Sequence, residues 1–235
     1  MASTKTTESL FPTNIVPSDD ELPPGFKEFL EPLHRWLTSN QGSYKDGRSA
    51  ALDESLKGMP PQHLSTRGFN LIKSGDWKIA VPEWCADQRN QMTGPADDAE
   101  LCVKMLNSGA PGVMLDLEDS QANTWANLKR GIENAVKALH GELEYGDKKR
   151  GLTVGIKPSR TVTFVRVRGL HMSQHGVFDE PVSAPLFDAA MLVYLLDPAK
   201  LKHPPCIYIP KTESSSEAQW WRWLFEELAA AKGMP

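Results

Sequence analysis

The fold is decided by residues 92–136, MTGPADDAELCVKMLNSGAPGVMLDLEDSQANTWANLKRGIENAV, where strand-like and helix-like patterns follow one another. The run from Gly112 to Leu117 is almost wholly apolar, as a buried parallel strand requires. A helix follows it, capped near Asn123 or Thr124, with its apolar residues on one face. This order of strand and helix is the unit from which parallel sheets are built.

The same unit occurs four times between residue 89 and the C-terminus. The predicted strands cover 90–93, 112–117, 161–167 and 206–209, and the predicted helices cover 97–107, 123–139, 185–196 and the segment after Ser214. Ser214 and Glu217 stand at capping-box spacing. Repeated βα units imply an open doubly wound sheet or a closed (β/α)8 TIM barrel. A barrel needs about 250 residues, so residues 89–235 would form the first half of one, an incomplete barrel.

The residues before the first strand have a different character. Residues 1–23 are predicted to be a flexible lead-in. Residues 24–88 are predicted to be a small α-helical region and connector, with a helix at 24–37 that carries a wide apolar stripe and a weaker one at 49–56. The connector is rich in proline and glycine, so regular structure there should be short.

Composition excludes several classes of protein. The net charge is −4, from 26 basic and 30 acidic residues mixed along the chain, so no basic stripe is offered to nucleic acid. No apolar run is long enough to span a membrane. The three cysteines lack CxxC spacing. The first 23 residues also lack the pattern of a secretory or organellar signal, so a cytoplasmic location is expected. Oligomeric state is not indicated.

Polar residues follow each predicted strand, where ligands bind in both architectures. Strand one ends at Thr93 and Gly94, where a glycine lets backbone approach a ligand. The other strand ends carry charged residues: Asp116, Glu118 and Asp119 on strand two, Arg166 and Arg168 on strand three, and Lys211 and Glu213 on strand four. The sequence therefore predicts a charged site at this edge of the sheet.

The three carboxylates of LDLEDS would repel one another unless a cation or hydrogen-bond donors offset their charge. Magnesium prefers oxygen ligands and is the predicted partner. The alternative is structural: Asp119 caps the next helix and Asp116 forms an ion pair within the fold. The end-of-strand position favours a role in the site.

Alternation along FVRVRG predicts that Arg166 and Arg168 lie on the same side of their strand. Two guanidinium groups aimed at one place would suit a small carboxylate or carbonyl oxygen. The alternative is an arginine ladder paired with the nearby acids. His171 and His175 are four residues apart, but this spacing alone is weak support for zinc.

Together these motifs resemble those of malate synthases. Residues 92–136 resemble the family's segment from the first barrel strand through the acidic strand end. The other similar stretches, in the family's order, are SGDWKIA at 74–80, FVRVRGLHM at 164–172, EPVSAPLFD at 180–188 and YIPKTESSSEAQWW at 208–221.

The resemblance implies a TIM barrel with an N-terminal helical clasp that condenses acetyl-CoA with glyoxylate, using Mg²⁺. It implies that Arg166 is the catalytic arginine and that Glu118 and Asp119 hold the waters of the metal. The strand-end positions add Thr93, Gly94 and Arg168, together with Arg166, as candidates for substrate binding. Asp116, Lys211 and Glu213 are possible accessory residues. The family's direct metal ligands and catalytic aspartate come from later segments, so this N-terminal part should hold no direct metal ligand and be inactive alone.

Two motifs differ from the usual family pattern. The chain has Arg-Val-Arg-Gly-Leu where A-type malate synthases show Arg-Pro-Arg-Gly-Trp, and LDLEDS leans towards the related citrate lyase β and aldolase branch. Two alternatives therefore stay open. One is a carbon–carbon lyase acting on a β-hydroxy acid or acyl-CoA, and the other is a non-catalytic remnant that binds an anion.

Overall fold

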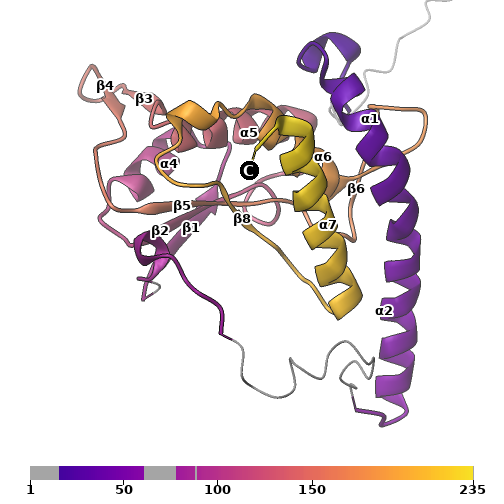
Figure 1. Ribbon diagram of the computed structural model, residues 1–235. Coiled ribbons are helices and arrows are strands. Elements are labelled where there is room, and N and C mark those ends of the chain that lie inside the picture. The colour runs from indigo at the N-terminus through magenta and orange to yellow at the C-terminus, as the bar shows by residue number, and fades with distance from the viewer. Residues whose placement is uncertain (1–15, 61–77, 88, 235) are drawn as a thin grey trace, which may run out of the picture.

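A parallel four-stranded sheet lies at the centre of the computed structural model, which describes residues 16–60, 78–87 and 89–234 (Figure 1). Each strand of this sheet pairs in parallel with its neighbour, and the order across the sheet follows the order along the chain. The order is β1 (Gln91–Pro95), β2 (Gly112–Asp116), β5 (Val162–Arg166) and β8 (Cys206–Tyr208). The predicted parallel sheet is confirmed.

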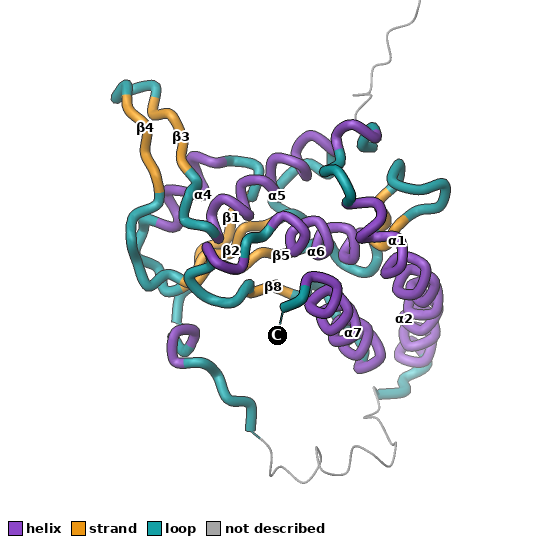
Figure 2. Tube along the Cα trace, turned by 45° about the horizontal axis from the view of Figure 1, so that its top comes forward, coloured by secondary structure: helices purple, strands orange, loops and turns teal. Residues whose placement is uncertain are grey.

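A helix follows each of these strands. They are α4 (Ala99–Leu106), α5 (Trp125–Leu139), α6 (Ala184–Leu195) and α7 (Ser215–Lys232). Each contacts the next, and Figure 2 shows α4, α5 and α6 side by side along the sheet. Strands in sequential order with right-handed crossovers place their helices on one face, as in the wall of a TIM barrel. The chain thus has the α/β architecture of a partial barrel.

Local capping explains where three of these four helices begin. The Asp98 side chain accepts from the backbone N–H of Leu101 at α4, and Thr124 accepts from Asn127 at α5. Ser214 accepts from the backbone N–H of Glu217 at α7. These side chains satisfy backbone donors that have no partner within the helix. The caps predicted at Thr124 and Ser214 are confirmed.

The strands are in register, which aligns their carboxyl ends. Pro95, Asp116, Arg166 and Tyr208 occupy one row across the sheet. Side chains in one row of parallel strands point to the same face, and the neighbouring residues point to the other. Val165 faces the helices and is buried, whereas the row through Arg166 lies on the opposite face, where Tyr208 is exposed.

Two further helices, α1 (Phe26–Leu37) and α2 (Gln41–Leu56), lie end to end beside α7 (Figure 1). A 3-10 turn, η2 (Thr38–Asn40), joins them, and another, η1 (Asp19–Glu21), precedes α1. Phe26 packs edge-on against Phe187 of α6, with 5.6 Å between ring centroids. The apolar face of α1 is therefore part of the same core as the βα units. A separate domain at 24–88 stays a prediction.

The structure starts α2 at Gln41, eight residues before the predicted Ser49. Gly42 and Gly47 lower the helix propensity of this turn, so the pattern alone did not favour a helix. The missing stabilisation comes from tertiary contact. The Gln41 side-chain amide donates to the carbonyls of Leu170 and Met172, at 2.6 and 2.8 Å.

Besides η1 and η2, six short elements of the described residues were not predicted. They are the hairpin β3 (Glu144–Asp147) and β4 (Leu152–Gly155), the pair β6 (Ser173–Gln174) and β7 (Val182–Ser183), and the 3-10 turns η4 (Glu83–Cys85) and η5 (Pro198–Lys200). The predictions for residues 1–15 and 61–77 lie outside the described residues. These include most of the lead-in and the first part of SGDWKIA.

Candidate functional site

Arg166 and Asp116 face each other at the carboxyl ends of β5 and β2. Arg166 Nε lies 2.7 Å from Asp116 Oδ1, and Nη2 lies 2.6 Å from Oδ2. The two residues share one row of the sheet, so the strand register itself brings them together. Two parallel hydrogen bonds fix the plane of the guanidinium as well as its position.

Asp116 is fully buried, and the hydrogen bonds that it accepts keep it ionised. Burial alone would raise its pKa. Hydrogen bonds from Arg166, the Ser120 hydroxyl and the Glu118 backbone N–H overcome that effect and hold the pKa of Asp116 below its ordinary value. The same pair raises the pKa of Arg166, chiefly through its hydrogen bond with Asp116.

Lys211, three residues after β8, bridges the other two acids of the predicted cluster. Its Nζ lies 3.1 Å from Glu118 Oε1 and 2.8 Å from Asp119 Oδ1. Asp119 Oδ2 also lies 3.3 Å from Arg166 Nη2. The hydrogen bond with Asp119 is the main reason that the pKa of Lys211 is raised. The structure thus brings Asp116, Glu118, Asp119, Arg166 and Lys211 into one network.

Glu118 is buried and only half satisfied. Its Oε1 accepts from the backbone N–H of Gly169 at 3.1 Å, whereas Oε2 is buried with no hydrogen-bond partner among the described residues. A Cβ at Gly169 would lie 3.0 Å from Glu118 Oε1 and 2.7 Å from His171 Nδ1, so a larger residue here would displace one of these side chains. An unsatisfied buried carboxylate oxygen is costly unless another donor reaches it.

Gly169, His171 and Ser120 belong to this neighbourhood but were not assigned to the site from the sequence. His171 Nε2 lies 3.8 Å from Glu118 Oε1. In the sequence, the position of Gly169 directly after Arg168 in FVRVRG could have indicated that it lies at the site. Ser120 lies within the LDLEDS motif, so its position next to the acids was also visible.

The described residues fit the outer surroundings of a hydrated magnesium ion. The free Oε2 of Glu118 could accept from a water of the metal. Among the described residues, no group of three or more His, Cys, Asp or Glu side chains could hold a metal directly. Arg166 and Lys211 pair with these acids and so offset part of their charge within the fold. Magnesium as a further partner of the acids stays a prediction.

Arg168 does not join Arg166 at a shared target, so the predicted two-arginine fork is wrong in its geometry. Its Nη2 lies 2.7 Å from Asp188 Oδ1 on α6 and 2.8 Å from Gln174 Oε1. Its Nη1 lies 3.3 Å from Asn123 Oδ1. The side chain is 3% exposed. Because β5 ends at Arg166, the alternation of a strand does not extend to Arg168.

The remaining predicted residues have distinct surroundings. Thr93 is exposed and shares its row with Met114, so it lies on the face of Arg166. Gly94 is buried, and a Cβ there would lie 2.8 Å from the end of the Met105 side chain, so a larger residue would force that side chain of α4 to shift. Glu213 pairs with Arg48 of α2, at 3.2 Å.

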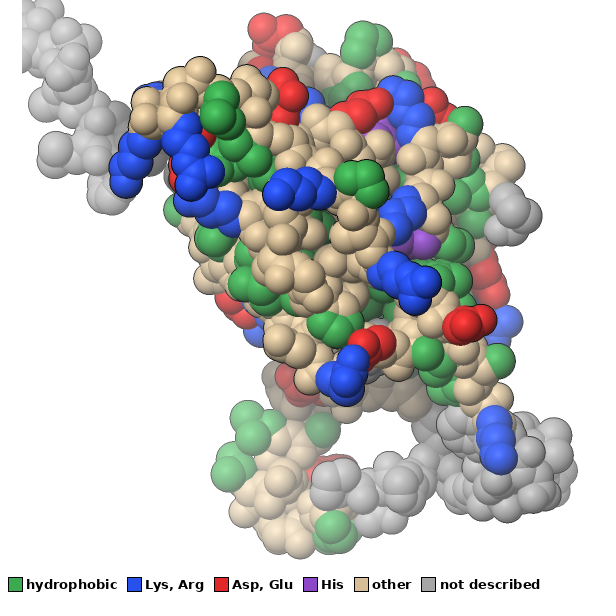
Figure 3. All heavy atoms as spheres, turned by 90° about the vertical axis from the view of Figure 1, so that its left-hand side faces the viewer, with side chains coloured by type: hydrophobic (Ala, Val, Ile, Leu, Met, Phe, Trp, Pro, Cys, Tyr) green, Lys and Arg blue, Asp and Glu red, His purple; other side chains and the backbone are tan. Residues whose placement is uncertain are grey.

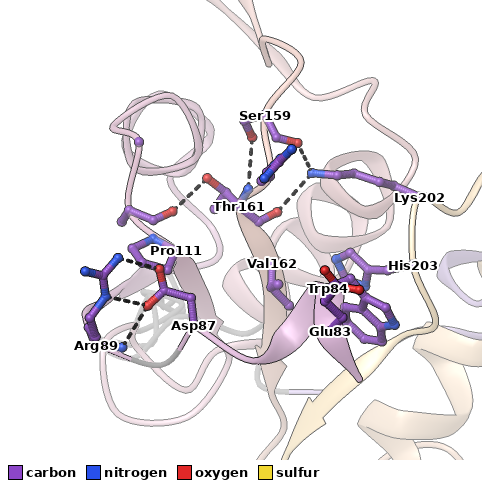
Figure 4. Close-up of a pocket in the computed structure, with 13 residues that line it drawn as sticks. Glu83, Trp84, Asp87, Arg89, Pro111, Ser159, Thr161, Val162, Lys202 and His203 are labelled. Atoms are coloured by element: carbon purple, nitrogen blue, oxygen red, sulfur yellow. Dashed lines mark hydrogen bonds and ion pairs between the residues drawn. The ribbon is translucent and has the colours of Figure 1, made fainter. Parts of the chain in front are cut away.

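A cavity of about 800 Å³ lies at the opposite end of the sheet (Figure 4). It is lined by residues that precede the strands, such as Thr161 and His203, and by Trp84, whose ring stacks on His203 at 5.0 Å. Ligands of parallel α/β folds bind at the carboxyl ends of the strands. We therefore place the candidate site around Arg166 and not in this cavity.

The face drawn in Figure 3 carries its lysine and arginine side chains in separate groups with neutral atoms between them. None of the helices formed by the described residues has the length and apolar character needed to cross a membrane.

Comparison with known proteins agrees with this architecture. Residues 162–235 match the family described as "Malate synthase, TIM barrel domain". Malate synthase of Myxococcus xanthus is 31% identical over 219 residues, which is 91% of this chain and 40% of that protein.

Two plant proteins give similar matches. Malate synthase of Arabidopsis thaliana is 35% identical over 70% of this chain and 30% of its own length. The glyoxysomal malate synthase of Zea mays is 34% identical over 70% of this chain and 31% of its own length. The chain thus spans 30–40% of the length of these curated relatives, and over that span it belongs to the malate synthase family.

Proposed function

We propose that this chain supplies the arginine and outer acidic groups of a malate synthase active site. The reaction would condense acetyl-CoA with glyoxylate and water to give malate and CoA. The observation that carries this proposal is the Arg166 guanidinium, fixed by two hydrogen bonds to Asp116 at the carboxyl end of a parallel strand. Sites of TIM barrels are built at this end of the strands.

Arg166 has donors to spare for substrate. Among the described residues, the acids contact its Nε and Nη2, which leaves the Nη1 donors for an oxygen of glyoxylate. A fixed positive charge at the glyoxylate carbonyl would stabilise the alkoxide that forms when the new carbon–carbon bond closes. Asp116 holds the guanidinium in place, and its lowered pKa keeps it anionic at neutral pH.

Glu118 and Asp119 would orient the waters of a magnesium ion through carboxylate oxygens such as the unsatisfied Oε2 of Glu118. When bound, the metal supplies Lewis-acid polarisation of the glyoxylate carbonyl. Lys211 keeps the two acids in place, because its ammonium contacts both. The proposed substrate contact of Thr93 would come from its exposed position on the same face.

The direct test is an assay of glyoxylate-dependent CoA release. The 235-residue chain would be assayed alone and after fusion to the remaining part of the Myxococcus xanthus malate synthase. We expect turnover only from the fusion, because the chain spans 40% of the length of that relative. Turnover by the chain alone would refute the proposal that the chain holds only part of the active site. Cleavage of malyl or citramalyl thioesters without condensation would identify the lyase instead.

Arg166→Lys and Arg160→Lys form a matched pair for this assay. Arg160 precedes β5 and lines the cavity at the opposite end of the sheet. The proposal expects loss of turnover in Arg166→Lys and full turnover in Arg160→Lys. Equal turnover in both would remove Arg166 from the reaction.

We propose a cytoplasmic location, which is supported by the cysteines. Three cysteines, Cys85, Cys102 and Cys206, cannot all pair with one another, which fits a reducing compartment. Fractionation of cells expressing the tagged chain, with markers for the cytosol and for organelles, tests this. Recovery with an organelle fraction would contradict it.

A further inference from the structure

An arginine of α2, far from the predicted site in the sequence, forms a buried ion pair with α7. Arg48 Nε lies 2.8 Å from Glu217 Oε1, and its Nη2 lies 2.7 Å from Glu217 Oε2. The Glu217 side chain is 1% exposed and that of Arg48 is 19% exposed. The partners are 169 residues apart, and the parallel pair of hydrogen bonds fixes the plane of the guanidinium.

The same guanidinium holds the loop between β8 and α7. Arg48 Nη2 donates to the carbonyl of Lys211 at 2.7 Å, and Nη1 lies 3.2 Å from Glu213 Oε1. Glu217 Oε2 accepts from the backbone N–H of Glu213 at 3.0 Å, which fixes the loop from its other side. In a simple capping box Glu217 would bond to the backbone of Ser214 instead. The residue is thus used to tie the loop to Arg48.

Lys211 has a backbone conformation that needs such support. Its φ is +50°, and it is the one residue other than glycine with positive φ among the described residues. This region is unfavourable for a side chain with a Cβ and persists where surrounding contacts impose it. The orientation of the Lys211 peptide determines the direction in which its side chain leaves the loop. That side chain reaches Glu118 and Asp119.

We propose that Arg48 is a positioning residue of the site, which holds the Lys211 carbonyl and thereby directs the Lys211 ammonium onto Glu118 and Asp119. The relevance for catalysis rests on the proposed function, in which these acids orient the waters of a metal. The positioning of Lys211 by Arg48 does not depend on that function, because it rests on the contacts of Arg48 alone. Arg48 links α2 of the N-terminal segment to the site through the Lys211 carbonyl, and none of its hydrogen bonds or ion pairs among the described residues is with Glu118 or Asp119. Its removal should release Lys211 even where the fold is retained.

A purely structural role makes a different prediction. If Arg48 only anchors α2 to α7, its replacement lowers stability but leaves Lys211 on its acids. If Arg48 positions Lys211, the amine loses its carboxylate partners, and its pKa falls from the raised value that the hydrogen bond with Asp119 gives it. The free amine is the nucleophilic form, so the rate of its acetylation reports this difference.

The experiment measures trace acetylation of single lysines by mass spectrometry in the full 235-residue chain. The variants are Arg48→Met and Arg48→Lys. Arg222→Met is the matched control, because Arg222 forms an exposed ion pair with Glu226 on α7. Lys148, exposed in the turn between β3 and β4, is the internal reference.

In Arg48→Met, we expect Lys211 acetylation to rise severalfold relative to Lys148, because a fall in the pKa of Lys211 increases the fraction of free amine. In Arg48→Lys we expect a smaller rise in Lys211 acetylation, because the lysine keeps a positive charge next to Glu217. A rise should remain, since one ammonium cannot form two parallel bonds with Glu217 and also reach the Lys211 carbonyl. Arg222→Met should resemble the wild type. Unchanged Lys211 acetylation in folded Arg48→Met would overturn the proposal.

A rise at every lysine in Arg48→Met would mean that the chain has unfolded. Arg48→Lys, checked for folding by circular dichroism, then decides the question: a selective rise at Lys211 supports positioning, and no rise overturns it. The readout needs no turnover. A chain without malate synthase activity can therefore still show the Lys211 response, and the two proposals fail separately.

Discussion

Arg166 and Arg168 are separated by a single valine, yet the fold gives them opposite surroundings. Arg166 ends β5 and pairs with Asp116 and Asp119, with 16% of its side chain exposed. Arg168 lies just beyond the strand, is 3% exposed, and pairs with the fully buried Asp188. The first keeps donors free on the open face of the sheet, and the second is enclosed.

From this difference we infer that the two arginines have separate tasks. Three hydrogen bonds from the Arg168 side chain to Asp188, and one each to Gln174 and Asn123, join the end of β5 to α6 and its neighbouring loops. Its backbone N–H also donates to Asp188 at 2.9 Å. We infer that Arg168 stabilises the loop that carries Gly169 and that Arg166 is left for chemistry.

Arg168→Met should have the largest effect of the variants that test this comparison. This change leaves the Asp188 carboxylate buried without its partner, and loss of one member of a buried ion pair costs about 3–5 kcal/mol. The free energy of unfolding from urea titration measures the effect. The double variant Arg168→Met/Asp188→Leu is the control and should recover much of the loss, because no charge is then left buried. A loss as small as that of an exposed arginine would show that Arg168 is not structurally important.

Arg166→Lys should have the reverse profile. The lysine keeps the charge next to Asp116 but loses the fork geometry and the spare donors. We expect kcat of the fusion enzyme to fall by about 100- to 1,000-fold, the usual cost of losing a donor to a developing oxyanion. Unfolding free energy should fall less than in Arg168→Met. An enzyme with normal kcat and reduced stability would exchange the roles of the two arginines.

The smallest effect expected is a dependence of stability on pH at Asp116. The pKa of this carboxyl is lowered from its ordinary 3.8 in the folded chain, so ionised Asp116 stabilises the fold. That contribution is complete above the ordinary pKa and is lost as the pH falls through the lowered value. Stability of the wild type relative to Asp116→Asn should therefore be constant near neutral pH and shrink below pH 3.8. A difference that stays constant through the acid range would contradict this pairing.

Much of the fold follows from local patterns. The apolar run of β2 and the β-branched residues of β5 predict strands because they suit a buried sheet. The caps at Thr124 and Ser214 predict where two helices begin. The start of α2 could not be predicted in this way, because Gln41 is stabilised by carbonyls 129 and 131 residues away in the sequence.

The site was predictable only as far as strand ends determine it. Asp116 and Arg166 meet because parallel strands in register align their ends. The environment of Arg168 depends on where β5 stops and on Asp188 of α6, neither of which spacing reveals. Arg48 has no motif at all. Its contacts with Lys211 and Glu217 exist only after the N-terminal segment has packed against α7.

The row that joins Pro95, Asp116, Arg166 and Tyr208 leaves no tolerance for a change in strand length. Side-chain direction reverses at each residue, so deleting one residue within β5 would turn Arg166 towards the helices and bring Val165 to the opposite face. The guanidinium would then have to be buried among apolar side chains of α5 and α6. Natural variation in this chain should therefore spare the length of β5 even where its apolar residues are exchanged for one another.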